Sequence, residues 1–166
     1  MILDHVGIVV RCLEQGIDQW ETLFGYQRNS DIVQNVRQKV RVVFLSKPDS
    51  LTVKLIEPSS PDSPAFLAAR GGGGLHHLCF RCEALHEEIR RLQHRGARLI
   101  VSPQPGEAFC GHPIAFMLAG NNLNVELIDT SDKQGWGTCS SARPLDGYAT
   151  EQHAQVPEEG TKTPQK

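Results

Sequence analysis

The stretch LDHVGIVV at residues 3–10 recurs as LHHLCFRC at residues 75–82, and this repetition decides the fold. The same shift of 72 residues, carried along the chain without a gap, continues to align apolar positions with apolar positions. The aligned pairs are Leu13 and Leu85, Ile17 and Ile89, Trp20 and Leu92, Phe44 and Phe116, Val53 and Val125, Leu55 and Leu127, and Ile56 and Ile128. Self-similarity over such a span indicates that one structural unit is present twice.

Each copy follows the same order of secondary structure. The stretch at 2–10 is rich in β-branched residues, which is typical of a strand, and the apolar residues that follow recur at helical spacing. Polar or proline-containing breaks then separate three further predicted strands, at 26–33, 40–45 and 51–56. The elements predicted for the second copy are a strand at 74–82, a helix at 84–95 that ends at Gly96, and strands at 98–102, 113–118 and 123–128.

These elements predict an α+β fold in which two βαβββ modules form a cupped mixed sheet. We expect one domain at 1–129, with modules at 1–58 and 73–129 and a linker at 59–72. Because the single helix of each module covers one face of its strands, the other face is free to enclose a ligand.

The remainder of the chain differs in composition. Residues 130–166 contain few branched aliphatic side chains and many Gly, Pro, Ser, Thr and charged residues, so we predict a disordered tail. The five cysteines are odd in number and irregularly spaced, which predicts reduced thiols rather than a disulfide framework. One CxxC motif without a second pair does not predict a structural zinc site.

Composition also limits the class of partner. Of the 166 residues 22% are charged, and the formal net charge is -2, which provides no basic surface for nucleic acid. No apolar run approaches the roughly 20 residues that span a bilayer, and the first residues lack the pattern of a signal peptide. We therefore expect a cytoplasmic protein that acts on a small molecule and binds neither nucleic acid nor a membrane.

Two consecutive histidines stand in the second copy of the opening strand, and the repeat distinguishes between them. His77 aligns with His5, whereas His76 aligns with Asp4. Successive side chains of a strand point to opposite faces, so His5 and His77 are expected to face the cup, with Cys79 on the same face as His77.

The same shift aligns Lys54 with Glu126 on the last strand of each copy, and both stand between apolar neighbours. Ionisable groups at such positions are costly unless they are paired, bound to a metal or solvated in a cavity. Lys54 and Glu126 are therefore expected to face the cup together with the two histidines.

With these residues, the chain resembles the vicinal oxygen chelate superfamily, which includes glyoxalases, extradiol dioxygenases, fosfomycin and bleomycin resistance proteins and methylmalonyl-CoA epimerases. Its members pair two βαβββ modules around a divalent metal ion, with a histidine on the first strand and a carboxylate or amide on the last strand of each module. Within the superfamily, the chain is most similar to the epimerases. The similar segments are EPSSPDSPAFL, the glycine run into GLHHLCF, GARLIVSPQPG, GHPIAFM and NVELID.

The resemblance implies a divalent metal ion, one of Co, Mn, Zn, Ni or Fe, held by His5, His77 and Glu126. The chain departs from the epimerases at Lys54, where they carry Glu or Gln. A protonated lysine has no acceptor and repels a cation. Three arrangements are open: a metal on three ligands with Lys54 turned aside, a metal-free pocket in which the ammonium pairs with Glu126, or a lysine of lowered pKa that acts as a base or imine-forming nucleophile.

The epimerase resemblance also implies an isomerase that moves a proton next to a thioester carbonyl through an enolate. Glu126 is the expected base, and a metal or Lys54 is the expected electrophile that stabilises the oxyanion. Gln38 and Cys110, which the repeat aligns at the mouth of the cup, and Cys79 are expected in the substrate pocket. Many of the epimerases carry a histidine at the position of Cys110.

Two other functions are open. Some relatives of this fold sequester a drug without metal or turnover, and the loss of a ligand at Lys54 favours such a metal-free binding protein. A glyoxalase-type lyase or a ring-cleaving dioxygenase could use the same three ligands. In the epimerase interpretation the partner is an acyl thioester, and because modules of this superfamily also pair between subunits, a homodimer is expected.

Overall fold

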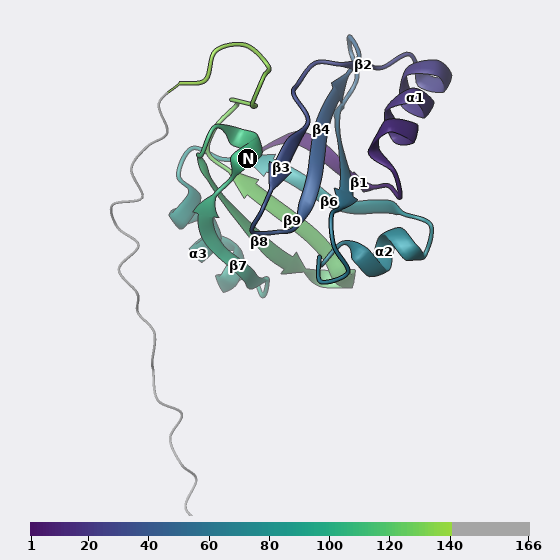
Figure 1. The fold of residues 1–166 in the computed structure, drawn as a ribbon. Helices are drawn as coiled ribbons and strands as arrows, with labels where there is room; N and C mark the ends of the chain where they lie inside the picture. Colours follow the sequence, from purple (N-terminus) through teal and green to yellow (C-terminus); the bar gives the residue numbers. More distant parts are fainter. Residues whose placement is uncertain (141–166) are drawn as a thin grey trace, which may run out of the picture.

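The computed structural model of the chain describes residues 1–140 and confirms an α+β fold with two βαβββ modules (Figure 1). The first module consists of β1 (Ile2–Val9), α1 (Leu13–Phe24), β2 (Gln27–Arg28), β3 (Val33–Asn35), β4 (Val40–Ser46) and β5 (Thr52–Pro58). The second consists of β6 (Gly74–Arg81), α3 (Leu85–His94), β7 (Arg98–Pro105), β8 (Pro113–Ala119) and β9 (Leu123–Ile128). Shorter helices are α2 (Phe66–Arg70), between the modules, η1 (Glu107–Phe109) and η2 (Gly120–Asn122).

Two elements differ from the sequence prediction. In place of one strand predicted at 26–33, the structure has the short strand β2 and then β3, which begins at the last predicted residue; both pair with β4. The segment at 59–72, predicted as a linker, contains α2. Within the part of the chain that the structure describes, no helix has the length and apolar character needed to cross a bilayer.

The strands of residues 1–140 form one mixed sheet in the order β2-β4-β5-β1-β6-β9-β8-β7, with β3 paired to β4. The two opening strands, β1 and β6, are antiparallel neighbours at its centre, and each runs parallel to the last strand of its own module. The register repeats as well. Lys54 of β5 lies opposite Gly7 of β1, and Glu126 of β9 lies opposite Cys79 of β6, so the 72-residue repeat of the sequence is also a repeat of the sheet.

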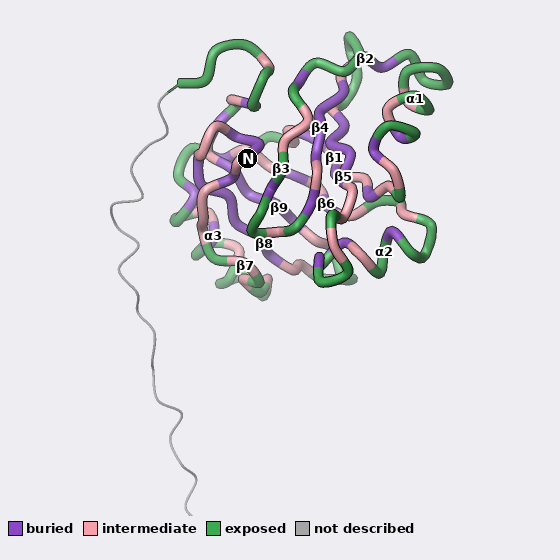
Figure 2. The backbone as a smooth tube through the Cα atoms, viewed as in Figure 1, coloured by how far each residue is buried: buried purple, intermediate pink, exposed green. Residues whose placement is uncertain are grey.

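Alternation along the strands separates the two faces of this sheet. Val6 packs in a cluster with Leu13 of α1, and Phe80 packs in a second cluster with Leu85 of α3. A third apolar cluster, which includes Phe44, fills the cup. Figure 2 shows buried positions along the central strands of both modules. The helices thus cover the outer face, and the cup-facing side chains are left to form a site.

The ordered chain continues beyond β9, where the sequence predicts disorder from residue 130. Lys133 is buried, and Trp136 packs on the cup cluster. The backbone of Gln134 accepts a hydrogen bond from Asp31 N at 3.3 Å and donates one to Ala108 O at 3.0 Å. Residues 130–140 contain no branched aliphatic side chain, and their contacts with the domain include one aromatic ring, one lysine and backbone hydrogen bonds. Residues 141–166, which carry the same disorder prediction, lie outside the described residues.

A disulfide joins Cys110 to Cys139, with their Cα atoms 6.0 Å apart, and ties residues 130–140 to the turn after η1. The prediction of reduced thiols is wrong for this pair. Spacing along the chain could not reveal the bridge, because the two cysteines meet only when the last segment packs across the domain. Cys12, Cys79 and Cys82 are free thiols.

Candidate active site

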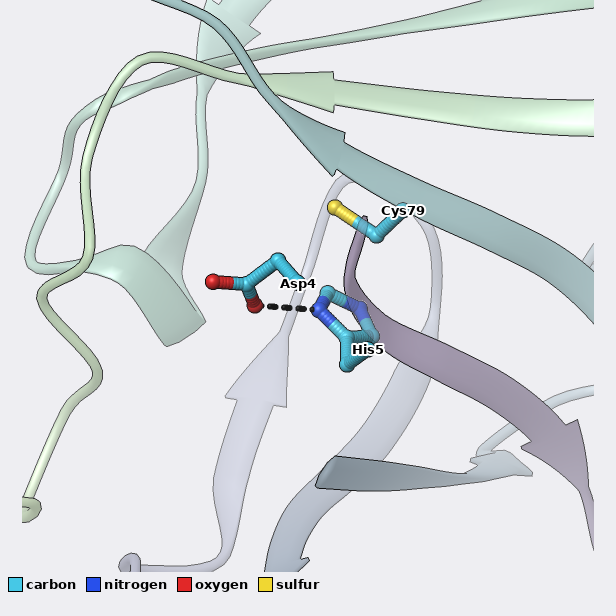
Figure 3. A group of neighbouring side chains, drawn as sticks. All are labelled: Asp4, His5 and Cys79. Carbon is cyan, nitrogen blue, oxygen red and sulfur yellow. Dashed lines mark hydrogen bonds and ion pairs between the residues drawn. The ribbon is translucent and has the colours of Figure 1, made fainter. Parts of the chain in front are cut away.

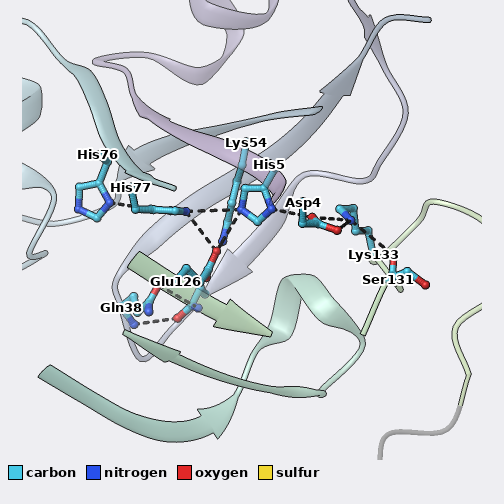
Figure 4. Close-up of polar contacts among 10 residues, drawn as sticks. Asp4, His5, Gln38, Lys54, His76, His77, Glu126, Ser131 and Lys133 are labelled. Carbon is cyan, nitrogen blue, oxygen red and sulfur yellow. Dashed lines mark hydrogen bonds and ion pairs between the residues drawn. The ribbon is translucent and has the colours of Figure 1, made fainter. Parts of the chain in front are cut away.

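Four ionisable side chains meet at the centre of the cup, as the repeat predicts (Figure 4). His5 comes from β1, Lys54 from β5, His77 from β6 and Glu126 from β9. Each is no more than 4% exposed. These residues are distant in the chain and adjacent in space because the four strands that carry them are neighbours in the sheet.

The Glu126 carboxylate is the centre of the cluster. Lys54 Nζ donates to Glu126 Oε1 at 3.0 Å and to Oε2 at 3.1 Å. His5 Nε2 and His77 Nε2 approach the same Oε2, at 3.0 and 3.1 Å, and lie 3.5 Å from one another. The ammonium thus pairs with Glu126, a contact that one of the three arrangements open from the sequence also contains.

The Nδ1 nitrogens of the two histidines also form hydrogen bonds. Their partners are Asp4 and His76, to which the sequence analysis gave no role. His5 Nδ1 donates to Asp4 Oδ1 at 2.8 Å, and His77 Nδ1 is hydrogen-bonded to His76 Nδ1 at 2.9 Å. Figure 3 shows Asp4 against the His5 ring, with Cys79 beside it. Asp4 and His76 align in the repeat, so each module uses the residue before its histidine to hold the ring, with Nε2 toward Glu126.

Burial and charge fix the protonation of the cluster. Burial alone raises the pKa of Glu126, but Lys54, His77 and the hydrogen bonds from both histidines outweigh it and hold that pKa well below its usual range. Burial lowers the pKa of His77 to about 4, against the attraction of Glu126. The site at pH 7 therefore contains an ionised carboxylate and a neutral His77.

The lowered pKa of His77 predicts a pH dependence of folding stability. An unfolded chain protonates His77 below its ordinary pKa of 6.5, whereas the folded chain resists protonation until about pH 4. The unfolded state binds more protons in this window, so the free energy of unfolding falls as the pH is lowered from 6.5 toward 4. The expected loss from this group is on the order of 3 kcal/mol.

Urea denaturation at several pH values between 4.5 and 7 measures this loss. His94, an exposed histidine at the end of α3, provides the control, and His94→Gln should leave the slope unchanged. A free energy of unfolding that stays level between pH 6.5 and 4.5 would contradict a neutral, buried His77.

A cavity of about 200 Å³ adjoins Lys54 and His77. Its wall is mostly apolar and comes from both modules. The lining residues are Gln38, Val40, Val42, Lys54, Ile56, Pro64, Ala65, His76, His77, Ile100, Val101, Phe116 and Asn124. Lys54 therefore contacts Glu126 and also borders the space that a ligand would occupy.

Of the three residues that the sequence assigns to the substrate pocket, one lines this cavity and two do not. Gln38 lines the cavity, whereas Cys79 and Cys110 are not among its lining residues. Cys79 is fully buried, which raises its thiol pKa well above the usual value, and Cys110 is in the disulfide. Glu126 is not a lining residue either, but it contacts Lys54 and His77, which are. His76, which sequence reasoning set aside, does line the cavity.

Three of the four central side chains are suitable ligands for a divalent metal ion. One donor atom each from His5, His77 and Glu126 lie within 4.8 Å of one another, so these three residues could hold an ion. The bond from His5 to Asp4 also matches the carboxylate that commonly orients a ligand histidine. Lys54 does not fit, because its ammonium has no lone pair to offer and already occupies both oxygens of Glu126.

Comparison with known proteins gives a consistent result. Residues 4–116 match the glyoxalase/bleomycin resistance protein/dioxygenase superfamily. The ethylmalonyl-CoA/methylmalonyl-CoA epimerase of Cereibacter sphaeroides is 30% identical over 117 residues, which are 69% of this chain and 86% of that protein. The crystal structure of methylmalonyl-CoA epimerase from Mycobacterium tuberculosis aligns with a TM-score of 0.68 and 27% identity, over 76% of this chain and 86% of that one.

A solved complex adds a ligand to these relatives. A variant of Streptomyces coelicolor methylmalonyl-CoA epimerase, in complex with 2-nitronate-propionyl-CoA, aligns with a TM-score of 0.69 and 22% identity. The alignment covers 79% of this chain and 98% of that one. At this identity the likeness concerns the fold, and the bound acyl-CoA compound is a property of that relative.

Proposed function

Because the chain belongs to the glyoxalase/bleomycin resistance protein/dioxygenase superfamily and is similar to methylmalonyl-CoA epimerases, we propose that it is an isomerase that moves a proton next to the carbonyl of an acyl thioester. One observation carries the proposal. The Lys54 ammonium is bonded to both oxygens of Glu126 and at the same time borders a cavity large enough for an acyl group.

The chemistry of proton removal explains why this ammonium matters. Taking a proton from the carbon next to a thioester carbonyl moves negative charge onto the carbonyl oxygen, and a fixed cation in a dry site stabilises that charge strongly. An ammonium has three N–H donors. The two bonds to Glu126 leave one for the enolate oxygen. In this proposal Lys54 provides the positive charge, and no divalent ion is required.

The arrangement assigns a different role to Glu126 from the one that the sequence predicts. Glu126 lies behind Lys54 and does not line the cavity, so it positions the ammonium and is not placed to take the substrate proton. His76 and His77 are the two imidazoles on the cavity wall. Both ring nitrogens of His77 already contact other side chains of the site. His76 uses only Nδ1 in its bond to His77. We assign proton transfer to His76.

Deuterium exchange tests the proposal. Protein treated with a chelator is incubated in D2O with methylmalonyl-CoA or ethylmalonyl-CoA, and deuterium at the carbon next to the carbonyl is measured by mass spectrometry. We expect exchange to persist without metal and to fall by about 10²- to 10³-fold in Lys54→Met. Lys47→Met is the matched control, because Lys47 is an exposed lysine whose ammonium donates to the Phe24 carbonyl and which does not line the cavity.

Two outcomes would contradict the proposal. Exchange that the chelator abolishes and a divalent ion restores would show that a metal provides the charge. Absence of exchange with both thioesters would exclude this isomerase activity.

The apolar lining of the cavity and the full engagement of Glu126 favour a second candidate, a metal-free binding protein. The same two thioesters separate the candidates. Heat released on ligand binding in a calorimeter, without any deuterium exchange, would support the binding protein.

A further inference from the structure

The buried polar contacts of the site continue outward to residues 130–140 (Figure 4). Lys133 Nζ lies 2.9 Å from Asp4 Oδ1 and 3.2 Å from Asp4 Oδ2. Asp4 Oδ1 accepts the hydrogen bond from His5 Nδ1, and His5 Nε2 approaches Glu126, which holds Lys54. One connected row of ionisable groups therefore runs from the last described segment of the chain to the cavity.

Water has little access to the outer part of this row. The side chain of Lys133 is 8% exposed and that of Asp4 is 10% exposed. Lys133 Nζ also lies 5.4 Å from the centre of the Phe44 ring and 5.6 Å from that of Trp136, where a cation is attracted to the ring faces. A carboxylate in such surroundings depends on its ion pair, and Lys133 is the cation that the structure places on Asp4.

The segment that carries Lys133 is attached at several points. Gln134 makes backbone hydrogen bonds to Asp31 and Ala108, on two different parts of the domain. The Trp136 ring lies 6.4 Å from that of Phe44, centre to centre. The Cys110–Cys139 disulfide closes the far end. These contacts bring the ammonium of Lys133 to one defined place beside Asp4.

We propose that Lys133 is a positioning residue of the candidate site: together with Asp4 it holds the His5 ring with Nε2 toward Glu126, so that the carboxylate keeps the Lys54 ammonium at the cavity. Residues 130–140 are then part of the site and not a tail that follows it. The catalytic consequence rests on the proposed isomerase function. The orientation of the His5 ring does not, because it requires no substrate.

The test compares Lys133→Met with the wild type in the full chain. Methionine keeps the apolar contacts with Phe44 and Trp136 and removes the charge. We expect the ¹⁵N resonances of the His5 ring nitrogens to shift, and kcat for deuterium exchange to fall by about 10- to 100-fold with KM little changed. Lys133→Arg restores the charge and should recover both readouts. Lys47→Met again serves as the matched lysine control.

A second variant keeps the test decisive if Lys133→Met folds poorly. Asp4→Asn keeps the size of the side chain and removes its charge, and it should produce the same shift of the His5 resonances. Because both residues act on one ring, adding Lys133→Met to Asp4→Asn should cost little more than Asp4→Asn alone.

The failure of this proposal is distinguishable from failure of the isomerase function. A Lys133→Met protein of lower thermal stability whose His5 resonances match the wild type would mean that Lys133 only anchors the segment. Additive effects of Lys133→Met and Asp4→Asn would also contradict a shared action on His5. If the wild type exchanges no deuterium, the isomerase function is wrong, while the His5 resonances still decide the role of Lys133.

Discussion

Lys54→Met is expected to lower the free energy of unfolding by about 3–5 kcal/mol, because removing one partner of a buried ion pair leaves the other charge uncompensated. Glu126 is fully buried, and in that variant it keeps its contacts with the two histidines but loses the ammonium that is bonded to both of its oxygens. Its pKa would rise without the ammonium, so the deficit should shrink as the pH is lowered and the carboxyl becomes neutral. Urea denaturation at pH 7 and pH 5 measures both effects.

A second substitution isolates the ion pair as the cause. Lys54→Met combined with Glu126→Gln removes both charges, and it should recover most of the stability that Lys54→Met alone loses. Lys47→Met, at the exposed lysine, should change stability by less than about 0.5 kcal/mol. If Lys54→Met is as stable as Lys47→Met, the ammonium is not paired with Glu126 inside the cup.

Gly7→Ala is expected to disrupt the site with a single methyl group. A Cβ at Gly7 would lie 2.3 Å from Cε1 of the His77 ring and 2.6 Å from both of its nitrogens. The ring cannot retreat without losing its bonds to Glu126 and His76. We expect a loss of about 1–3 kcal/mol in the free energy of unfolding, and a loss of about 10²-fold in deuterium exchange from the displaced ring.

Gly120→Ala is the matched control, because a Cβ at Gly120 meets no atom within 4 Å. Thermal unfolding and deuterium exchange are measured on both variants. A Gly7→Ala protein that keeps the stability and exchange of Gly120→Ala would mean that His77 does not lie against Gly7.

The fold and the four central residues could be predicted because two periodicities act together. The 72-residue repeat orders the strands, and the alternation of each strand sends His5 and His77 to one face and Val6 to the other. Once each last strand lies beside its opening strand, Lys54 and Glu126 must meet. No side-chain detail is needed for that inference.

Other parts of the site depend on contacts that no periodicity encodes. Lys133 and Asp4 are 129 residues apart, and no repeat links them. The Cys110–Cys139 bridge likewise forms only after the last segment has packed across the domain. Lys54 borders the cavity and Glu126 does not. Strand alternation places both side chains in the cup, and their packing against each other decides which of them borders the cavity. The sequence predicts that both side chains face the cup, and of the two Lys54 lines the cavity.

In the proposed account, the charge balance of the cluster favours a lysine over a divalent metal ion. Lys54 and Glu126 cancel each other's charge, and His77 is neutral. A divalent ion added beside the Lys54 ammonium would leave two further positive charges without a counter-charge among these buried side chains, which is strongly unfavourable. Replacing the lysine with a carboxylate reverses this balance and completes a ligand set of two histidines and two carboxylates.

The metal content of the purified protein tests this central claim most directly. Wild type and Lys54→Glu are expressed with Co, Mn, Zn, Ni and Fe in the medium and purified without added metal, and each is analysed by inductively coupled plasma mass spectrometry. The account predicts far less than one divalent ion per chain in the wild type and close to one in Lys54→Glu. One tightly held ion per wild-type chain would contradict it.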